Sequence, residues 1–132
     1  MLLAGVIAIV LSVVANLVVR WLGMLIITVP ADFIPLATIQ PTIIFTTLFL
    51  VVATLVFAVI NRFTSNPIRV WTIVGTIGFV ISLLPDVMLL FNPASMQAVG
   101  TVTTGAVVIL IAMHVVGFAI TMWVFTRWAP RT

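Results

Sequence analysis

The sequence predicts an all-α fold, an integral membrane four-helix bundle, and two observations lead to this prediction. Of the 132 residues, 64% are hydrophobic and only 5% are charged, whereas about 25% of an ordinary globular chain is charged. The chain also divides into four apolar runs, each long enough to cross a hydrocarbon core of about 30 Å, joined by short polar or proline-rich connections. We expect a single transmembrane domain over 1–132, with helices at about 2–28, 41–61, 69–91 and 98–128.

The first run, residues 2–28, is expected to carry its polar side chains on one face. Ser12, Asn16 and Arg20 recur every four residues, which places them on the same side of a helix. The run lacks a basic leader segment and is longer than the apolar part of a signal peptide, which has about 7 to 15 residues. We interpret it as a retained membrane helix whose polar face points into the bundle.

The connection over residues 29–41 is the longest in the chain and contains Pro30, Pro35 and Pro41. Proline at this density excludes a continuous helix, because each proline lacks a backbone N–H and its ring obstructs the preceding turn. Apolar members such as Phe33 indicate that the connection lies back on the bundle.

The third run carries a small-residue face and an internal proline. Gly75, Gly78 and Ser82 have the spacing that allows helix backbones to approach closely, so they are predicted to form a helix-packing face. Pro85 is expected to kink the helix, with the Ser82 hydroxyl helping to satisfy the carbonyl that Pro85 leaves without a donor. Trp71, near the start of the run, suits the membrane interface.

The arginines predict the topology. Four spans place both termini on one side, together with Arg62 and Arg69 in the central turn and Arg127 and Arg131 in the C-terminal tail. The opposite loops contain Asp32 and no basic residue. By the positive-inside rule both termini are cytoplasmic, and a multi-pass protein of the bacterial plasma (inner) membrane is the simplest localisation.

Two charged residues lie inside predicted spans and away from their ends, Arg20 in the first and Asp86 in the third. A charge inside a membrane segment needs a partner or water, and both residues fall in the outer third of the bilayer. We therefore predict an Arg20–Asp86 ion pair. It could be a structural fastening of the first helix to the third, or a binding or ion-translocating site in which Asp86 exchanges a proton.

Asn16 and His114 both fall near the midplane of the bundle. A hydrogen bond between them would satisfy one ring nitrogen of a core histidine, and Asn16, Arg20, Asp86 and His114 would then form one intramembrane polar cluster. The alternative is a ligand role for His114, the only candidate for a metal, a haem or a (bacterio)chlorophyll magnesium. A single histidine cannot supply bis-histidine ligation within one chain, and no metal site is predicted.

Several classes of function lack support in the sequence. The net charge of +3 is too small and too dispersed for a nucleic-acid surface. Without cysteine there is no disulfide and no thiolate ligand. The sequence shows no phosphate loop, no zinc spacing and no Ser/His/Asp set, so we predict no catalytic residue and no enzyme activity.

Short segments along the chain resemble a family of short, uncharacterised bacterial four-span membrane proteins. The matching segments are Asn16-Leu-Val-Val-Arg20, Asp32-Phe-Ile-Pro35, Arg62-Phe-Thr, Pro67-Ile-Arg69, Ser82-Leu-Leu-Pro-Asp86 and Met113-His114-Val115. The resemblance covers nearly the whole chain. It implies a four-helix membrane protein and no catalytic activity.

Three hypotheses for function follow. The first is a non-enzymatic accessory or structural subunit of a larger membrane complex, in contact with lipid and with other subunits or copies of itself. The second is a homo-oligomeric small transporter or channel that uses Arg20, Asp86 and His114. The third is a membrane protein that binds a pigment, a haem or a quinone through His114. The sequence does not identify the cofactor, if there is one.

Overall fold

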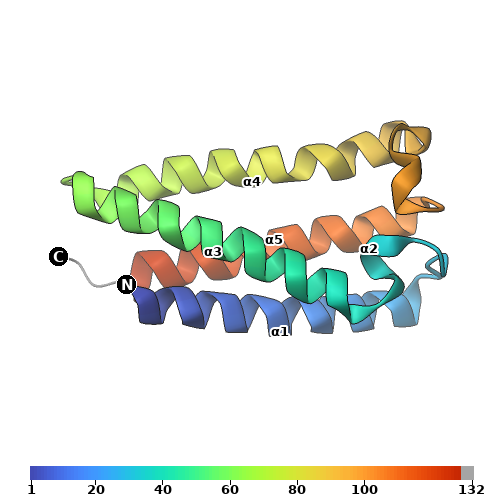
Figure 1. Ribbon diagram of the computed structural model, residues 1–132, viewed down its shortest axis with the longest axis horizontal. Helices are drawn as coiled ribbons and strands as arrows, with labels where there is room; N and C mark the ends of the chain where they lie inside the picture. The colour runs from blue at the N-terminus through green and yellow to red at the C-terminus, as the bar shows by residue number, and fades with distance from the viewer. Residues whose placement is uncertain (129–132) are drawn as a thin grey trace.

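The computed structural model describes residues 1–128, which form helices and connecting turns (Figure 1). The elements are α1 Leu2–Ile26, α2 Ile34–Ala37, α3 Ile39–Phe63, α4 Pro67–Phe91, the 3₁₀ helix η1 Pro93–Val99, and α5 Thr104–Arg127. Helices α1, α3, α4 and α5 are long and apolar enough to cross a membrane. The predicted all-α fold with four membrane-spanning helices is confirmed.

The long helices run alternately up and down (Figure 1). Helix α1 begins, α5 ends and the turn from α3 to α4 lies at one end, here called the terminal end. Helices α2 and η1 lie at the other end, here called the loop end. Helices α1 and α4 are on opposite sides of the bundle, and each packs mainly against α3 and α5.

The loop end explains why α5 begins later than predicted, at Thr104 rather than near residue 98. Residues 93–99 form the 3₁₀ helix, and Gly100 follows with φ +88°, a conformation that residues with a side chain rarely adopt. A Cβ at Gly100 would also collide with the carbonyl oxygen of Asp32. Helix α5 then starts after Thr103, whose hydroxyl oxygen accepts from the Ala106 amide at 3.3 Å.

The connection between α1 and α3 lies back on the bundle as predicted, and Phe33 and Leu36 are fully buried. It contains the single turn α2. Helix α3 begins at Ile39, two residues earlier than predicted, so Pro41 lies in the first turn. The missing N–H of Pro41 breaks no helical hydrogen bond there, because the first amides of a helix have no intrahelical acceptor.

The terminal end is held together by an aromatic cluster from three helices. Phe57 of α3 and Phe125 of α5 are stacked with ring centroids 4.9 Å apart. Trp71 of α4 meets both rings edge-on, at 5.4 Å from Phe57 and 5.2 Å from Phe125. Trp71, which was expected to suit the membrane interface, lies near the terminal end of α4, but its side chain is only 4% exposed, since aromatic rings facing it on α3 and α5 enclose the indole.

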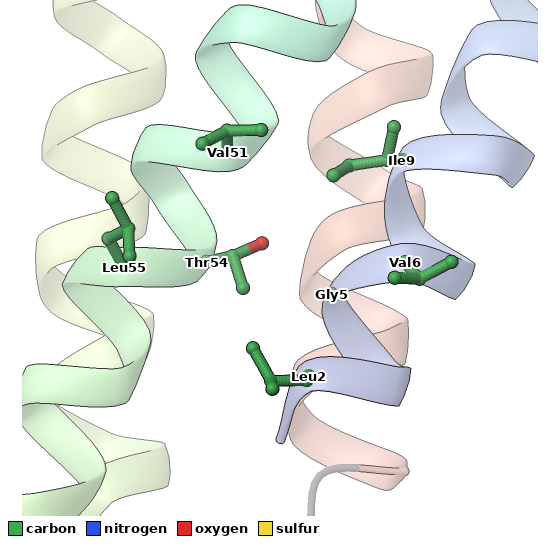
Figure 2. Close-up of a pocket in the computed structure, with 7 residues that line it drawn as sticks. All are labelled: Leu2, Gly5, Val6, Ile9, Val51, Thr54 and Leu55. Carbon is green, nitrogen blue, oxygen red and sulfur yellow. The ribbon is translucent and has the colours of Figure 1, made fainter.

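Close approach of the helices occurs at glycines that lie in no recognisable packing motif of the sequence. A Cβ at Gly5 of α1 would collide with Thr54 of α3, and Figure 2 shows the Thr54 side chain directed toward this glycine. A Cβ at Gly23 would come within 2.8 Å of Ile109 on α5, and one at Gly105 would collide with Ile27. These three glycines let α1 pack closely on α3 and α5. The apolar hollow in Figure 2, about 190 Å³, lies beside the first of these contacts.

Candidate functional site

A groove of about 600 Å³ lies between α3 and α4. Helix α5 contributes Met113, His114 and Gly117 to its lining. The buried indole of Trp71 lies at its terminal end, and Met96 of η1 lies at its loop end. Figure 1 shows α3 and α4 closest at the turn that joins them and diverging toward the loop end. The groove therefore lies within the apolar, membrane-spanning part of the helices.

The α4 wall of the groove carries the predicted small-residue face. Gly75 lies against α5, where a Cβ would be 3.3 Å from the Met122 sulfur. Gly78 has no heavy atom within 4 Å of its Cβ position, and Ser82 is half-buried and lines the groove. The prediction that Gly78 packs against another helix of this chain is wrong. The cause is that α3, which could have filled this space, diverges from α4 beyond the aromatic cluster.

Helix α4 runs without interruption through Pro85, which also lines the groove. The Ser82 hydroxyl donates to the Phe79 carbonyl at 2.7 Å. The predicted hydrogen bond from Ser82 to the Ile81 carbonyl, which Pro85 leaves without a donor, is therefore not formed. The Ser82 hydroxyl bonds the carbonyl three residues before Ser82 instead.

Asp86 pairs with His114 across α4 and α5. His114 Nδ1 lies 3.0 Å from Asp86 Oδ2 and 2.9 Å from the Leu110 carbonyl oxygen. Both neighbours are acceptors, so Nδ1 carries the proton and shares it between them. One N–H cannot fully satisfy two acceptors, which leaves the 5% exposed Asp86 carboxylate able to accept a further bond. The Nε2 of His114 has no hydrogen-bond partner within residues 1–128, and this residue lines the groove.

Asn16 belongs to a second polar pair, between α1 and α3. Its amide Nδ2 donates to Thr46 Oγ1 at 3.1 Å. The predicted Asn16–His114 hydrogen bond is therefore not formed, although the two residues are neighbours. Asn16 Nδ2 is 3.7 Å from the Cβ position of Gly117, and Gly117 is one turn along α5 from His114. Asp86, His114, Asn16 and Thr46 thus form a layer across the groove, here called the polar layer.

Arg20 does not join the polar layer. Its guanidinium Nη2 donates to the Leu36 carbonyl at 2.7 Å, next to the end of α2. No Arg20–Asp86 ion pair occurs in the described structure, where the Asp86 carboxylate is against His114. The physical reason is lateral position, because α1 and α4 lie on opposite sides of the bundle while α5 lies next to α4. Similar depth in the membrane was not enough to bring the two charges together.

Several buried polar atoms along the groove lack a hydrogen-bond partner. Within residues 1–128 they are Asn16 Oδ1, Thr42 Oγ1, Trp71 Nε1 and Asp86 Oδ2, the last of which lies against His114 Nδ1. Such atoms are uncommon in folded proteins, and those in a hollow can be satisfied by a bound molecule. The sequence reasoning missed Thr42 and Thr46. Their spacing of four residues on α3 was a usable signal, because it places both on one helix face.

Residues 1–131 match a family of unknown function, DUF6069. The chain belongs to this family. The resemblance to uncharacterised four-span membrane proteins is thereby confirmed. No curated protein and no solved structure matches the chain.

The groove of this DUF6069 chain can offer hydrogen bonds to a bound molecule. Within residues 1–128 no group of three His, Cys, Asp or Glu side chains could hold a metal ion. His114 Nε2 could supply one axial ligand to a haem iron or a (bacterio)chlorophyll magnesium, because Nδ1 is occupied by Asp86 and Leu110.

Three of the arginines predicted to set the topology belong to the described residues, and all three lie at the terminal end. Arg62, Arg69 and Arg127 are exposed there. Arg131 lies outside the described residues.

Proposed function

We propose that this DUF6069 protein is a non-enzymatic membrane protein that binds an uncharged, lipid-soluble amphiphile in the α3–α4 groove, with the hydroxyl head of the ligand at the polar layer. The observation that carries the proposal is the presence of buried acceptors without donors beside an otherwise apolar hollow. Asn16 Oδ1 has no partner, and the Asp86 carboxylate has only a shared one.

The dimensions and chemistry of the groove define the ligand class. Its volume of about 600 Å³ lies within the range of about 300 to 1,000 Å³ typical of small-molecule sites. Side chains such as Phe45, Phe49 and Val74 give it apolar walls, which suit a hydrocarbon chain. Because the polar layer has more acceptors than donors, it favours a head group that donates an O–H. The Asp86 carboxylate disfavours an anionic head group.

A photoactivatable long-chain alcohol tests this proposal. The protein is reconstituted in liposomes with hexadecanol that carries a diazirine on its chain, irradiated, and digested for mass spectrometry. We expect cross-links concentrated on α3 and α4 residues that line the groove. Gly78→Leu should reduce them at least about tenfold, because a side chain there enters open space and occupies the site.

The matched control is Thr76→Leu, on the exposed face of α4 and outside the groove lining. It adds a similar apolar side chain without filling the hollow, so cross-linking should stay at the wild-type level. Cross-links spread evenly over all lipid-facing positions, and equal in both variants, would refute binding in the groove.

One observation favours a second candidate, the accessory subunit of a larger complex. The open Gly78 position next to Ser82 is the kind of surface on which a partner's transmembrane helix packs. In this case an assembly isolated from native membranes should contain a second chain, or a second copy, that cross-links to a cysteine at position 78. Absence of the assembly with Gly78→Leu, and its persistence with Thr76→Leu, would support this candidate over the small amphiphile.

The proposed location is the bacterial plasma membrane with both termini in the cytoplasm, because Arg62, Arg69 and Arg127 gather at the terminal end. The chain has no cysteine, so single cysteines report topology without background. A membrane-impermeant maleimide added to intact cells should label Ser95→Cys in η1 and leave Ser65→Cys in the opposite turn unlabelled. The reverse pattern would invert the topology.

A further inference from the structure

Arg20 carries a positive charge at membrane depth and has no anionic partner within residues 1–128. Its charge is not matched by Asp86, which lies against His114, or by Asp32, which accepts from Thr101 at the loop end. Within residues 1–128 no carboxylate forms a salt bridge with this guanidinium. A charge at membrane depth is expensive unless it is paired or reaches the interface. A counter-ion for Arg20 would therefore come from outside the described chain.

The position of Arg20 along α1 limits where that counter-ion can be. At about 1.5 Å per residue, Arg20 lies about 27 Å from Leu2 and about 9 Å from Ile26, and the hydrocarbon core is about 30 Å thick. The arginine is thus near the edge of the core on the loop side, within reach of the head groups by snorkelling. Its bond to Leu36, in the loop-end connection, directs the guanidinium toward that edge.

The hydrogen-bond inventory of the side chain leaves donors for a ligand. A guanidinium has five N–H donors. Nη2 donates to the Leu36 carbonyl, and Nε is buried without a partner. The remaining Nη hydrogens form the planar fork that suits the two oxygens of a phosphate. The adjacent Trp21 is 61% exposed, as expected for an indole at the head-group level.

We propose that Arg20 binds the phosphate of an anionic phospholipid in the leaflet at the loop end, while its bond to Leu36 holds the guanidinium in position. The site is separate from the groove and does not depend on the function proposed above. It gives a partner to an intramembrane arginine that has no acidic partner within residues 1–128.

Native mass spectrometry of the full chain tests this, with titration of phosphatidylglycerol or phosphatidylcholine into detergent micelles. We expect the wild type to bind a first phosphatidylglycerol at least about tenfold more tightly than phosphatidylcholine. Arg20→Gln should remove this preference while its amide keeps a donor for the Leu36 carbonyl. Arg127→Gln, the same charge change at an exposed position of the opposite end, should alter the affinity less than about twofold.

Each other outcome overturns the proposal. An equal wild-type affinity for the two lipids would do so without any variant, even if Arg20→Gln failed to fold. A lower melting temperature of Arg20→Gln with unchanged lipid affinity would show that Arg20 only caps the α2 carbonyls. Displacement of phosphatidylglycerol by millimolar inorganic phosphate would assign the anion to solution rather than to a lipid.

Discussion

The α1 side of the bundle and the α3–α4 side use small residues in opposite ways. On the α1 side, Gly5 and Gly23 each face a branched side chain that fills the space a Cβ would need. On the other side, Gly78 faces open space and lines the groove. The first arrangement brings helix backbones together, and the second keeps a volume empty between them.

The difference shows that small residues become packing residues only where a partner side chain occupies the space they leave. Lipid solvates an apolar side chain as well as protein does, so helices in a membrane associate through close packing and hydrogen bonds rather than through hydrophobic burial. The α1 side and the aromatic cluster at the terminal end should therefore carry most of the stability of the bundle, and the groove should be free to accept a bound molecule. The predictions below test this contrast.

The largest expected effect is on the aromatic cluster. Phe125→Ala should lower the free energy of unfolding by about 3 kcal/mol, the lower end of the range for a buried phenylalanine, because lipid solvates the ring in the unfolded chain. The measurement is denaturation by SDS in mixed micelles. Phe49→Ala is the control, since this ring lines the groove and is 61% exposed. Its effect should stay below about 0.5 kcal/mol; equal losses would mean that the groove is as tightly packed as the cluster.

A smaller effect is expected at the glycines. Gly23→Ala places a Cβ 2.8 Å from Ile109 and should destabilise the bundle by about 1 to 3 kcal/mol, the usual range for overpacking. Gly78→Ala meets nothing within 4 Å and should be neutral, or stabilising by about 0.5 to 1 kcal/mol, because alanine favours helix. The same denaturation assay compares the two. A destabilising Gly78→Ala would show that another helix covers this position.

These contrasts also show what the sequence could and could not predict. Helix number, the folding back of the proline-rich connection and the presence of polar residues at membrane depth follow from composition and spacing along one chain, which the sequence contains. The prediction for Gly78 failed because small-residue spacing describes one helix and not what faces it. The burial of Trp71 could not be predicted for the same reason, because Phe57 and Phe125 come from other helices.

The polar pairs illustrate this limit most clearly. Position along each helix predicts Arg20, Asp86, His114 and Asn16 at membrane depth, and the structure buries Asn16 and Asp86 and half-buries the other two. Pairing depends in addition on which helices are neighbours, and hydropathy does not contain that information. Helix α5 lies next to α4, so Asp86 meets His114, while Arg20 on the far side turns to the Leu36 carbonyl.

Double-mutant cycles should distinguish the observed Asp86–His114 pair from the Arg20–Asp86 pair that the sequence predicted. For Asp86→Ala and His114→Ala, we expect a coupling energy of about 0.6 to 1.7 kcal/mol, the range for hydrogen bonds between membrane helices. For Arg20→Ala and Asp86→Ala, the effects should be additive within about 0.3 to 0.5 kcal/mol. The charge exchange Arg20→Asp with Asp86→Arg should accordingly give no recovery. A coupling between Arg20 and Asp86 above that between Asp86 and His114 would reverse the assignment.

The smallest expected effect concerns the two hydrogen bonds from Thr101 to Asp32, here called the clasp, which join the two loops at the loop end. Thr101 donates to Asp32 Oδ2 from its hydroxyl at 2.7 Å and from its amide at 2.9 Å. Both bonds hold the pKa of Asp32 below its ordinary value of 3.8, and the bond from the hydroxyl is the larger cause. Because the folded-state pKa is the lower one, the clasp contributes fully above the ordinary value and is lost as the pH falls through the folded pKa.

In micelles, the Thr101 amide resonance should therefore keep its shift from neutral pH down to the ordinary pKa of 3.8 and move only below it. Asp32→Asn should abolish this titration, and Thr101→Val should raise the midpoint toward the ordinary value. Asp32 is exposed, so water competes for its carboxylate, and the loss of stability should be the least of the four effects. A Thr101 resonance that moves already above the ordinary pKa would mean that the bonds from Thr101 do not persist in the membrane-embedded protein.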